Sequence, residues 1–258
     1  MMLDEPYRFA EAVSNRRDYV EDQLRDGSPV VGLTYGDGIL LLTMGRGQKK
    51  LYETYDRIAM GSIGHPTDIE KLRQAAVDLA SVVGFNYSDA DVTLQQIVYF
   101  GLGPAVKGMF DDFIRSPYIA RILLAELDGD QGSVFYTVDY DGSFDTHEGH
   151  AAVGGSIEAD RGIKQRLDAD HQPDASLQVA LDVGLKAWSA GRSVGLQDEA
   201  AGEEETTVRD DEIQRVLREA VGDMTVEAMV LNRDRQAKSK AQSLTAEETK
   251  SVIDAIVA

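Results

Sequence analysis

The sequence predicts an α+β protein: a four-layer αββα sandwich of two antiparallel sheets with an extra N-terminal helix. Strand-like segments come in blocks rather than alternating with helices, which favours antiparallel sheets. Helical segments also come in blocks, which indicates that each block covers a different outer face. The chain has 258 residues, 43% of them hydrophobic, and is therefore long enough to bury the core of such a sandwich.

The first unit is a helix followed directly by a hairpin. Residues 7–25 have an amphipathic helical pattern with a narrow apolar stripe. The apolar positions that share this stripe are Phe9, Val13, Val20 and Leu24. Strands are expected at residues 28–35 and 39–43, joined by the turn Gly36-Asp37-Gly38, whose glycines tolerate positive φ.

The next block holds two strands and then two helices. They are expected at residues 50–54, 57–63, 67–84 and 93–113. Thr67 lies three residues before Glu70, the spacing of a capping box, and should open the first of these helices. Pro104 should kink or shorten the second one. Because the helices are consecutive, we expect them to pack as an antiparallel pair on one sheet face.

The remaining elements complete a single domain over residues 1–258. Further strands are expected at residues 120–127, 133–138, 150–153 and 224–231, and helices at residues 160–167, 175–190, 211–221 and 245–257. The last helix should begin at a second capping box, Thr245 with Glu248. The parts of the domain are residues 1–6, a helix at 7–26, the sandwich at 27–195, an acidic surface insertion at 196–223, and the last strand and helix at 224–258.

Composition narrows the classes of partner and compartment. The formal net charge of −19 argues against binding nucleic acid or an anionic membrane surface, because both attract basic proteins. No stretch of about 18 apolar residues is present, and the first residues lack the apolar segment of a secretory signal. The chain contains no cysteine, which fits the cytoplasm. A protein or peptide partner is the expectation.

Two segments resemble a known family. They are KKLYETYDRIAMGSIG at residues 49–64, and FYTVDYDGS at residues 135–143 ahead of the turn Gly154-Gly155-Ser156. Together with the order of elements, they resemble proteasome core-particle α subunits of the bacterial type, in the N-terminal-nucleophile hydrolase superfamily. The similarity covers about residues 9–190, and residues 224–231 continue it.

The resemblance implies a structural and gating role without catalysis. The subunit would form a ring with copies of itself, of seven members in this family, and stack on proteasome β subunits that carry out proteolysis. An ATP-dependent unfoldase or another activator would deliver substrates. Residues 1–6 would form the gate, and Pro6, Tyr7 and Phe9 would lie at the gate and ring contacts.

Ser28 is the candidate for a degenerate nucleophile. By the resemblance it occupies the place of the catalytic threonine of β subunits, but a helix precedes it. Met44 stands where the acid of the second strand is expected, and Gly155 stands where a turn serine is expected. The alternative is a self-processing hydrolase in which a freed Ser28 attacks a peptide carbonyl. A second alternative is a ring scaffold without a protease partner.

Lys50 is the candidate for activator binding. The resemblance implies that it binds the C-terminal carboxylate of an activator tail, a charge-assisted interaction suited to an ammonium group. Lys49 is the alternative candidate for this role. The four histidines, of which only His147 and His150 lie three residues apart, lack the spacing of a metal site. We expect neither a metal nor another cofactor.

Overall fold

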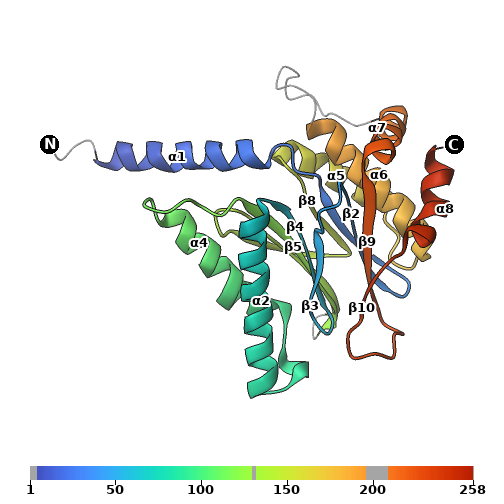
Figure 1. Cartoon of the computed structure of the whole chain (residues 1–258), viewed down its shortest axis with the longest axis horizontal. Coiled ribbons are helices and arrows are strands. Elements are labelled where there is room, and N and C mark those ends of the chain that lie inside the picture. Colours follow the sequence, from blue (N-terminus) through green and yellow to red (C-terminus); the bar gives the residue numbers. More distant parts are fainter. Residues whose placement is uncertain (1–4, 130–131, 196–208, 258) are drawn as a thin grey trace.

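The computed structural model describes residues 5–129, 132–195 and 209–257. It has two five-stranded antiparallel sheets stacked face to face, with helices on both outer faces (Figure 1). This is the predicted four-layer sandwich with its N-terminal helix, and the fold-class prediction is confirmed.

Each sheet combines segments that are distant in the sequence. The first has the order β10 (Ala241–Ser243), β9 (Thr225–Asn232), β2 (Gly38–Gly45), β1 (Val30–Tyr35) and β8 (His150–Val153). The second has the order β3 (Leu51–Tyr55), β4 (Ile58–Gly64), β5 (Ala120–Gly129), β6 (Gly132–Val138) and β7 (Phe144–Glu148).

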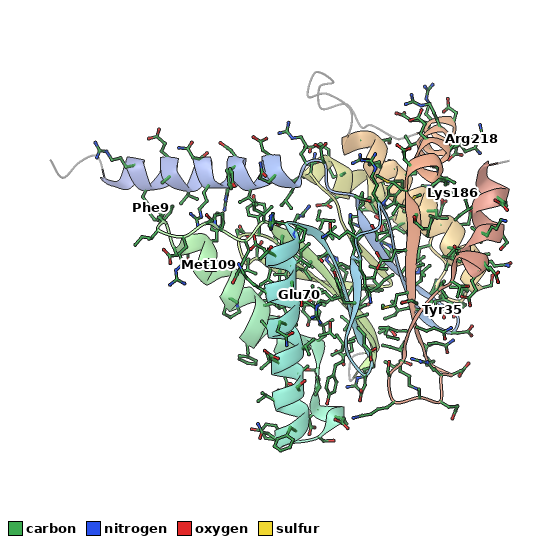
Figure 2. All side chains as sticks on the ribbon, in the orientation of Figure 1. Phe9, Tyr35, Glu70, Met109, Lys186 and Arg218 are labelled. Carbon is green, nitrogen blue, oxygen red and sulfur yellow. The ribbon has the colours of Figure 1, made fainter. Side chains whose placement is uncertain are left out.

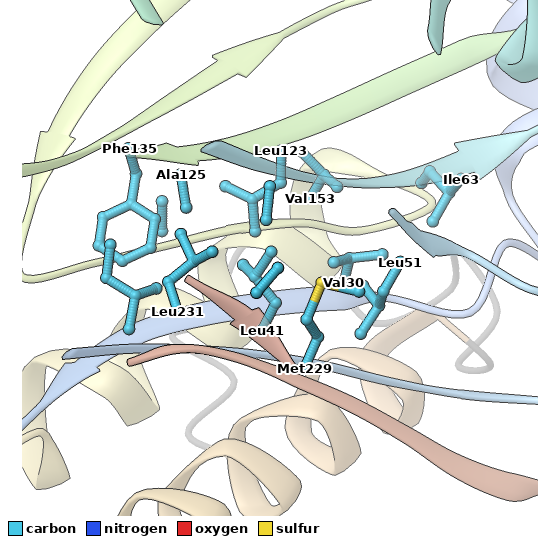
Figure 3. Packing of buried hydrophobic residues seen from close by; sticks show 14 of the residues in the cluster. Val30, Leu41, Leu51, Ile63, Leu123, Ala125, Phe135, Val153, Met229 and Leu231 are labelled. Carbon is cyan, nitrogen blue, oxygen red and sulfur yellow. The ribbon is translucent and has the colours of Figure 1, made fainter. Parts of the chain in front are cut away.

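Three apolar layers hold the sandwich together. Leu41, Phe135 and Met229 are buried between the two sheets, in the cluster drawn in Figure 3. The second layer lies between the first sheet and its helices, and the third lies between the second sheet and the other helices. On β1, Val30 belongs to the first layer and Val31 to the second, because successive side chains of a strand point to opposite faces. Both faces of each sheet are therefore buried.

The helices divide between the two outer faces. The face of the second sheet carries α2 (Pro66–Asn86), η1 (Asp89–Asp91), α3 (Leu94–Gln96), η2 (Ile97–Leu102) and α4 (Gly103–Asp111). The face of the first sheet carries α5 (Ile157–Asp170), α6 (Leu177–Gly195), α7 (Asp210–Asp223) and α8 (Ala246–Val257). These groups correspond to the two blocks of helices seen in the sequence.

The N-terminal helix α1 (Glu5–Leu24) extends beyond the sandwich (Figure 1). Its last turns are anchored by Val20 and Leu24, which are fully buried in the layer between the sheets. Its first turns lie over α4, where Phe9 is found in Figure 2. The helix starts two residues earlier than expected, so residues 5 and 6, assigned to the gate from sequence, are helical; residues 1–4 lie outside the described residues.

One of the two predicted capping boxes is wrong. The helix expected to open at Thr67 begins at Pro66, with His65 as its N-cap and no side-chain cap. Proline favours the first helical turn because its φ is already helical and it has no N–H to satisfy. Glu70 instead binds Arg73, with an oxygen–nitrogen distance of 2.6 Å. The other box is confirmed: the Thr245 N–H donates to Glu248 Oε2 at 2.7 Å.

Other differences have local causes. The single helix expected over residues 93–113 is interrupted by the π-helical turn η2, and Pro104 lies at the start of α4. The short edge strands β7 and β10 were missed, since a polar or three-residue edge strand has no clear alternation. Residues 210–223, grouped from sequence with the acidic insertion, form α7 and pack on α6. The rest of that insertion, residues 196–208, lies outside the described residues.

Candidate functional site

Ser28 lies just before β1, and its hydroxyl group both donates and accepts a hydrogen bond. The Oγ donates to the carbonyl oxygen of Met44 at 2.6 Å and accepts from the indole Nε1 of Trp188 at 3.0 Å. Trp188 belongs to α6 and is fully buried, so its N–H needs an acceptor inside the protein. The structure therefore uses the Ser28 hydroxyl to join the start of β1 to β2 and to the helix layer.

The two positions expected to lack their catalytic side chains have structural roles. Met44 is fully buried in the layer between the first sheet and α6. A Cβ atom on Gly155 would lie 2.4 Å from the Arg25 carbonyl oxygen and 2.6 Å from that of Leu24. A serine at this position would collide with the C-terminal end of α1. The close docking of α1 therefore requires a residue without a side chain at position 155.

Lys50 comes directly before β3 at the edge of the second sheet. Its Nζ donates to the Ser28 carbonyl oxygen at 3.3 Å, rather than to the Ser28 hydroxyl. Glu227 on β9 fixes its backbone: the Lys50 N–H donates to Glu227 Oε2 at 2.9 Å, and the Leu51 N–H donates to Oε1 at 3.0 Å. This carboxylate connects the two sheets and sets the position of Lys50.

The charge of Lys50 depends on its surroundings. Burial lowers the pKa of the Lys50 ammonium from 10.5 to about 8, because desolvation disfavours the charged form. The carboxylate of Glu227 opposes this shift in pKa, and the guanidinium of Arg192 adds to it. At neutral pH the side chain remains mostly an ammonium group.

A cavity of about 290 Å³ opens beside this lysine. Ser28, Met44, Lys49, Lys50, Tyr52 and Ser62 are among the residues that line it. Lys49 takes a different direction from Lys50: its Nζ lies 5.4 Å from the centre of the Tyr52 ring, and the Tyr52 hydroxyl donates to the Lys49 carbonyl oxygen at 2.6 Å. The structure thus brings Lys50, Ser28 and Met44 together, with Gly155 nearby at the end of α1.

The predicted ring and gate residues lie at the other end of α1. Phe9 is 62% exposed, and its ring packs edge-on against Phe113 with 5.5 Å between ring centres. Pro6 and Tyr7 are part of the first helical turns. Sequence reasoning missed Arg16, whose Nη2 donates to the carbonyl oxygens of Met109, Asp112 and Arg115 at 2.7–3.0 Å. No sequence pattern marks a side chain that binds the end of a helix 93 residues away.

Two of the four histidines, His150 and His171, lie side by side. The rings of His150 and His171 lie 5.2 Å apart, and the Nε2 of His150 is 3.2 Å from Asp168 Oδ1. Burial lowers the pKa of His150, which favours the neutral ring. Among the described residues, no group of three histidine or carboxylate side chains is arranged to hold a metal ion.

Comparisons with known proteins identify the family. The family model "Proteasome subunit" matches residues 24–200. The chain belongs to the proteasome subunit family. Proteins named proteasome subunit alpha are similar to it: that of Thermomonospora curvata is 30% identical over 187 residues, covering 71% of this chain and 79% of the relative. That of Xylanimonas cellulosilytica is 32% identical over 202 residues, covering 76% and 79%. Within the family, the chain is an α-type subunit.

Within the described ranges, none of the helices combines the length and the apolar character needed to cross a bilayer.

Proposed function

We propose that this chain is a non-catalytic subunit that forms a seven-membered outer ring in a cytoplasmic proteasome. The ring stacks on β subunits that cleave the substrate, and an ATP-dependent unfoldase or another activator docks on it. The observation that carries this proposal is the engagement of the Ser28 hydroxyl by Met44 and Trp188.

The proposed absence of catalysis is supported by what an N-terminal nucleophile requires. Such a residue needs a free α-amine to accept its hydroxyl proton, whereas the Ser28 nitrogen is in a peptide bond behind α1. Its hydroxyl proton is directed to the Met44 carbonyl oxygen at 2.6 Å. Lys50 donates to a backbone carbonyl oxygen, and the position expected for an acid is Met44. These contacts favour a structural Ser28.

The docking role rests on the Lys50 ammonium beside the cavity. An ammonium group has three N–H donors, and within the residues that the structure describes Lys50 uses one of them, toward Ser28. Glu227 holds the backbone, and its charge counteracts the lowering of the pKa of Lys50. A terminal carboxylate that enters the cavity meets a positioned, partly desolvated cation, where charge-assisted hydrogen bonds are strong. This supports Lys50 as the activator-tail residue.

Co-expression with a proteasome β subunit tests the proposed function. We expect native mass spectrometry to show rings of this chain stacked on β rings, and intact mass to show that the chain retains the residues before Ser28. Peptide hydrolysis should disappear when the β nucleophile is replaced and should persist in Ser28→Ala. Cleavage before Ser28 would favour a self-processing hydrolase. Rings that never bind a β subunit would favour a scaffold.

A further inference from the structure

Ser62 is a buried serine among the residues that line the cavity beside Lys50. It lies on β4, is fully buried, and lines the same cavity as Lys50. Its Oγ has no hydrogen-bond partner in the part of the chain that the structure describes. A buried donor without a partner costs free energy, and alanine would avoid that cost in the free protein. The hydroxyl is therefore available to a group that enters the cavity.

Strand pairing places this hydroxyl next to the lysine. Leu51 on β3 is opposite Gly61 on β4, and the Ser62 N–H donates to the Lys50 carbonyl oxygen at 3.3 Å. Lys50 and Ser62 are thus opposite one another at the end of this ladder, and side chains at opposite positions of an antiparallel pair share one face. One cationic donor and one neutral donor therefore serve a single cavity.

The charges around the cavity favour a ligand with one negative charge. Arg46, Lys49 and Lys50 line it together with Asp26. Arg46 lies 3.5 Å from the Asp223 carboxylate, and Glu227 holds the Lys50 backbone. The nearby carboxylates offset part of the positive charge, which disfavours a phosphate dianion. A carboxylate, with two oxygens able to accept from an ammonium and from a hydroxyl, matches the donors.

We infer that Ser62 is a binding residue for a peptide's terminal carboxylate: its hydroxyl donates to one carboxylate oxygen while the Lys50 ammonium binds the group. This inference rests on the proposed docking function and adds to it a second recognition group. Ser62 then makes binding depend on a hydrogen-bond acceptor in the ligand as well as on the ligand's charge. A peptide amide, which lacks the negative charge, gains little from either residue.

The experiment compares two forms of one probe on the assembled full-length chain. The probe is a fluorescein-labelled pentaalanine, with either a free C-terminal carboxylate or a C-terminal amide, and binding is followed by fluorescence anisotropy. We expect the wild type to bind the carboxylate form at least tenfold more tightly than the amide. Lys50→Ala should remove this preference, and Ser62→Ala should reduce it three- to tenfold without changing the affinity for the amide.

A second buried hydroxyl provides the matched control. Thr54 on β3 also has an Oγ without a partner among the described residues, but it does not line the cavity. Thr54→Val should therefore leave the preference for the carboxylate unchanged. Ser62→Cys keeps the shape of the side chain in a slightly larger volume but donates only weakly. It should lose the preference for the carboxylate as Ser62→Ala does, so that a packing fault in one variant is recognised.

Three outcomes would overturn the inference. A wild-type preference retained in both Ser62 variants removes Ser62 from the site while leaving Lys50 in place. Equal binding of the carboxylate and the amide by the wild type removes the carboxylate site altogether. Displacement of the probe by inorganic phosphate at lower concentration than by acetate assigns the cavity to a different anion. Ring formation and β stacking, read by native mass spectrometry, separate these results from a failure of the proposed function.

Discussion

The indole N–H of Trp188 donates to the Ser28 hydroxyl at 3.0 Å, across the boundary between α6 and the first sheet. In the same arrangement that hydroxyl donates to the Met44 carbonyl oxygen. The side chain at the position that the resemblance assigns to a nucleophile therefore has both of its hydrogen-bonding functions used by the core. This relationship supports the proposal that Ser28 has a structural role.

Replacing Ser28 by alanine should lower stability without affecting hydrolysis by the partner ring. The change leaves the Trp188 N–H without its acceptor and the Met44 carbonyl without its donor, at a cost of about 1–3 kcal/mol for unsatisfied buried groups. Trp188 is the single tryptophan of the chain, so its fluorescence reports urea unfolding directly. Loss of peptide hydrolysis in Ser28→Ala particles that still assemble would contradict a structural role for Ser28.

Restoring a serine at Gly155 should disrupt the docking of α1 rather than create activity. The new Cβ would lie 2.4 Å from the Arg25 carbonyl oxygen, so the end of the helix must move. Overpacking of this kind costs about 1–3 kcal/mol. Thermal unfolding and ring assembly should both decline. The control is Gly222→Ala on α7, where no heavy atom lies within 4 Å of the added Cβ and stability should hold or rise.

Arg16 should determine how firmly the first half of α1 is held. Its guanidinium binds three carbonyl oxygens at the end of α4, and alanine removes all three hydrogen bonds. We expect Arg16→Ala to increase hydrogen exchange and proteolysis in residues 8–16 at least fivefold and to weaken ring assembly, because the packing of Phe9 on Phe113 and of Val13 on the core is then left to hold this part of the helix. Arg17→Ala is the matched control, since Arg17 makes one exposed contact of 3.5 Å to Asp141. Equal effects of the two variants would refute this role.

Binding at Lys50 should weaken as the pH rises above about 8. The pKa of its ammonium is lowered to about 8, so the charge that holds a carboxylate is lost through that region, and Kd should rise about tenfold per pH unit beyond it. Stability changes in the opposite direction. Between about pH 8 and 10.5, Lys50 binds more protons in the unfolded chain than in the folded chain. The contribution of Lys50 to the free energy of unfolding therefore rises with pH in this range.

The pentaalanine carboxylate probe, titrated between pH 6 and 10, measures this dependence on the assembled chain. Lys50→Arg supplies the comparison, because a guanidinium stays charged over the whole range. Its carboxylate affinity should therefore be flat with pH, whatever its absolute value. A wild-type profile as flat as that of Lys50→Arg would mean that Lys50 does not carry the binding.

Local patterns were sufficient for the long elements and insufficient for their ends. The amphipathic stripe of α1 and the apolar runs of β1 and β2 predicted these elements because both their spacing and their burial are strong. The start of α2 was misjudged because Pro66 and the Thr67–Glu70 spacing gave competing signals. The site was predicted in part: Lys50, Ser28 and Met44 came from the resemblance, whereas Glu227, Arg16 and Ser62 did not.

The sequence by itself determined the class of fold, the family and the position of a serine behind a helix, since these depend on periodicity and order along the chain. Only the tertiary structure decided what that serine does. Ser28, Met44 and Trp188 meet because β1, β2 and α6 pack together, across up to 160 residues of sequence. The lowered pKa of Lys50 and the carboxylate of Glu227 at its backbone likewise arise from burial and strand pairing, which no local pattern encodes. The same holds for the Ser62 hydroxyl, which has no partner among the described residues.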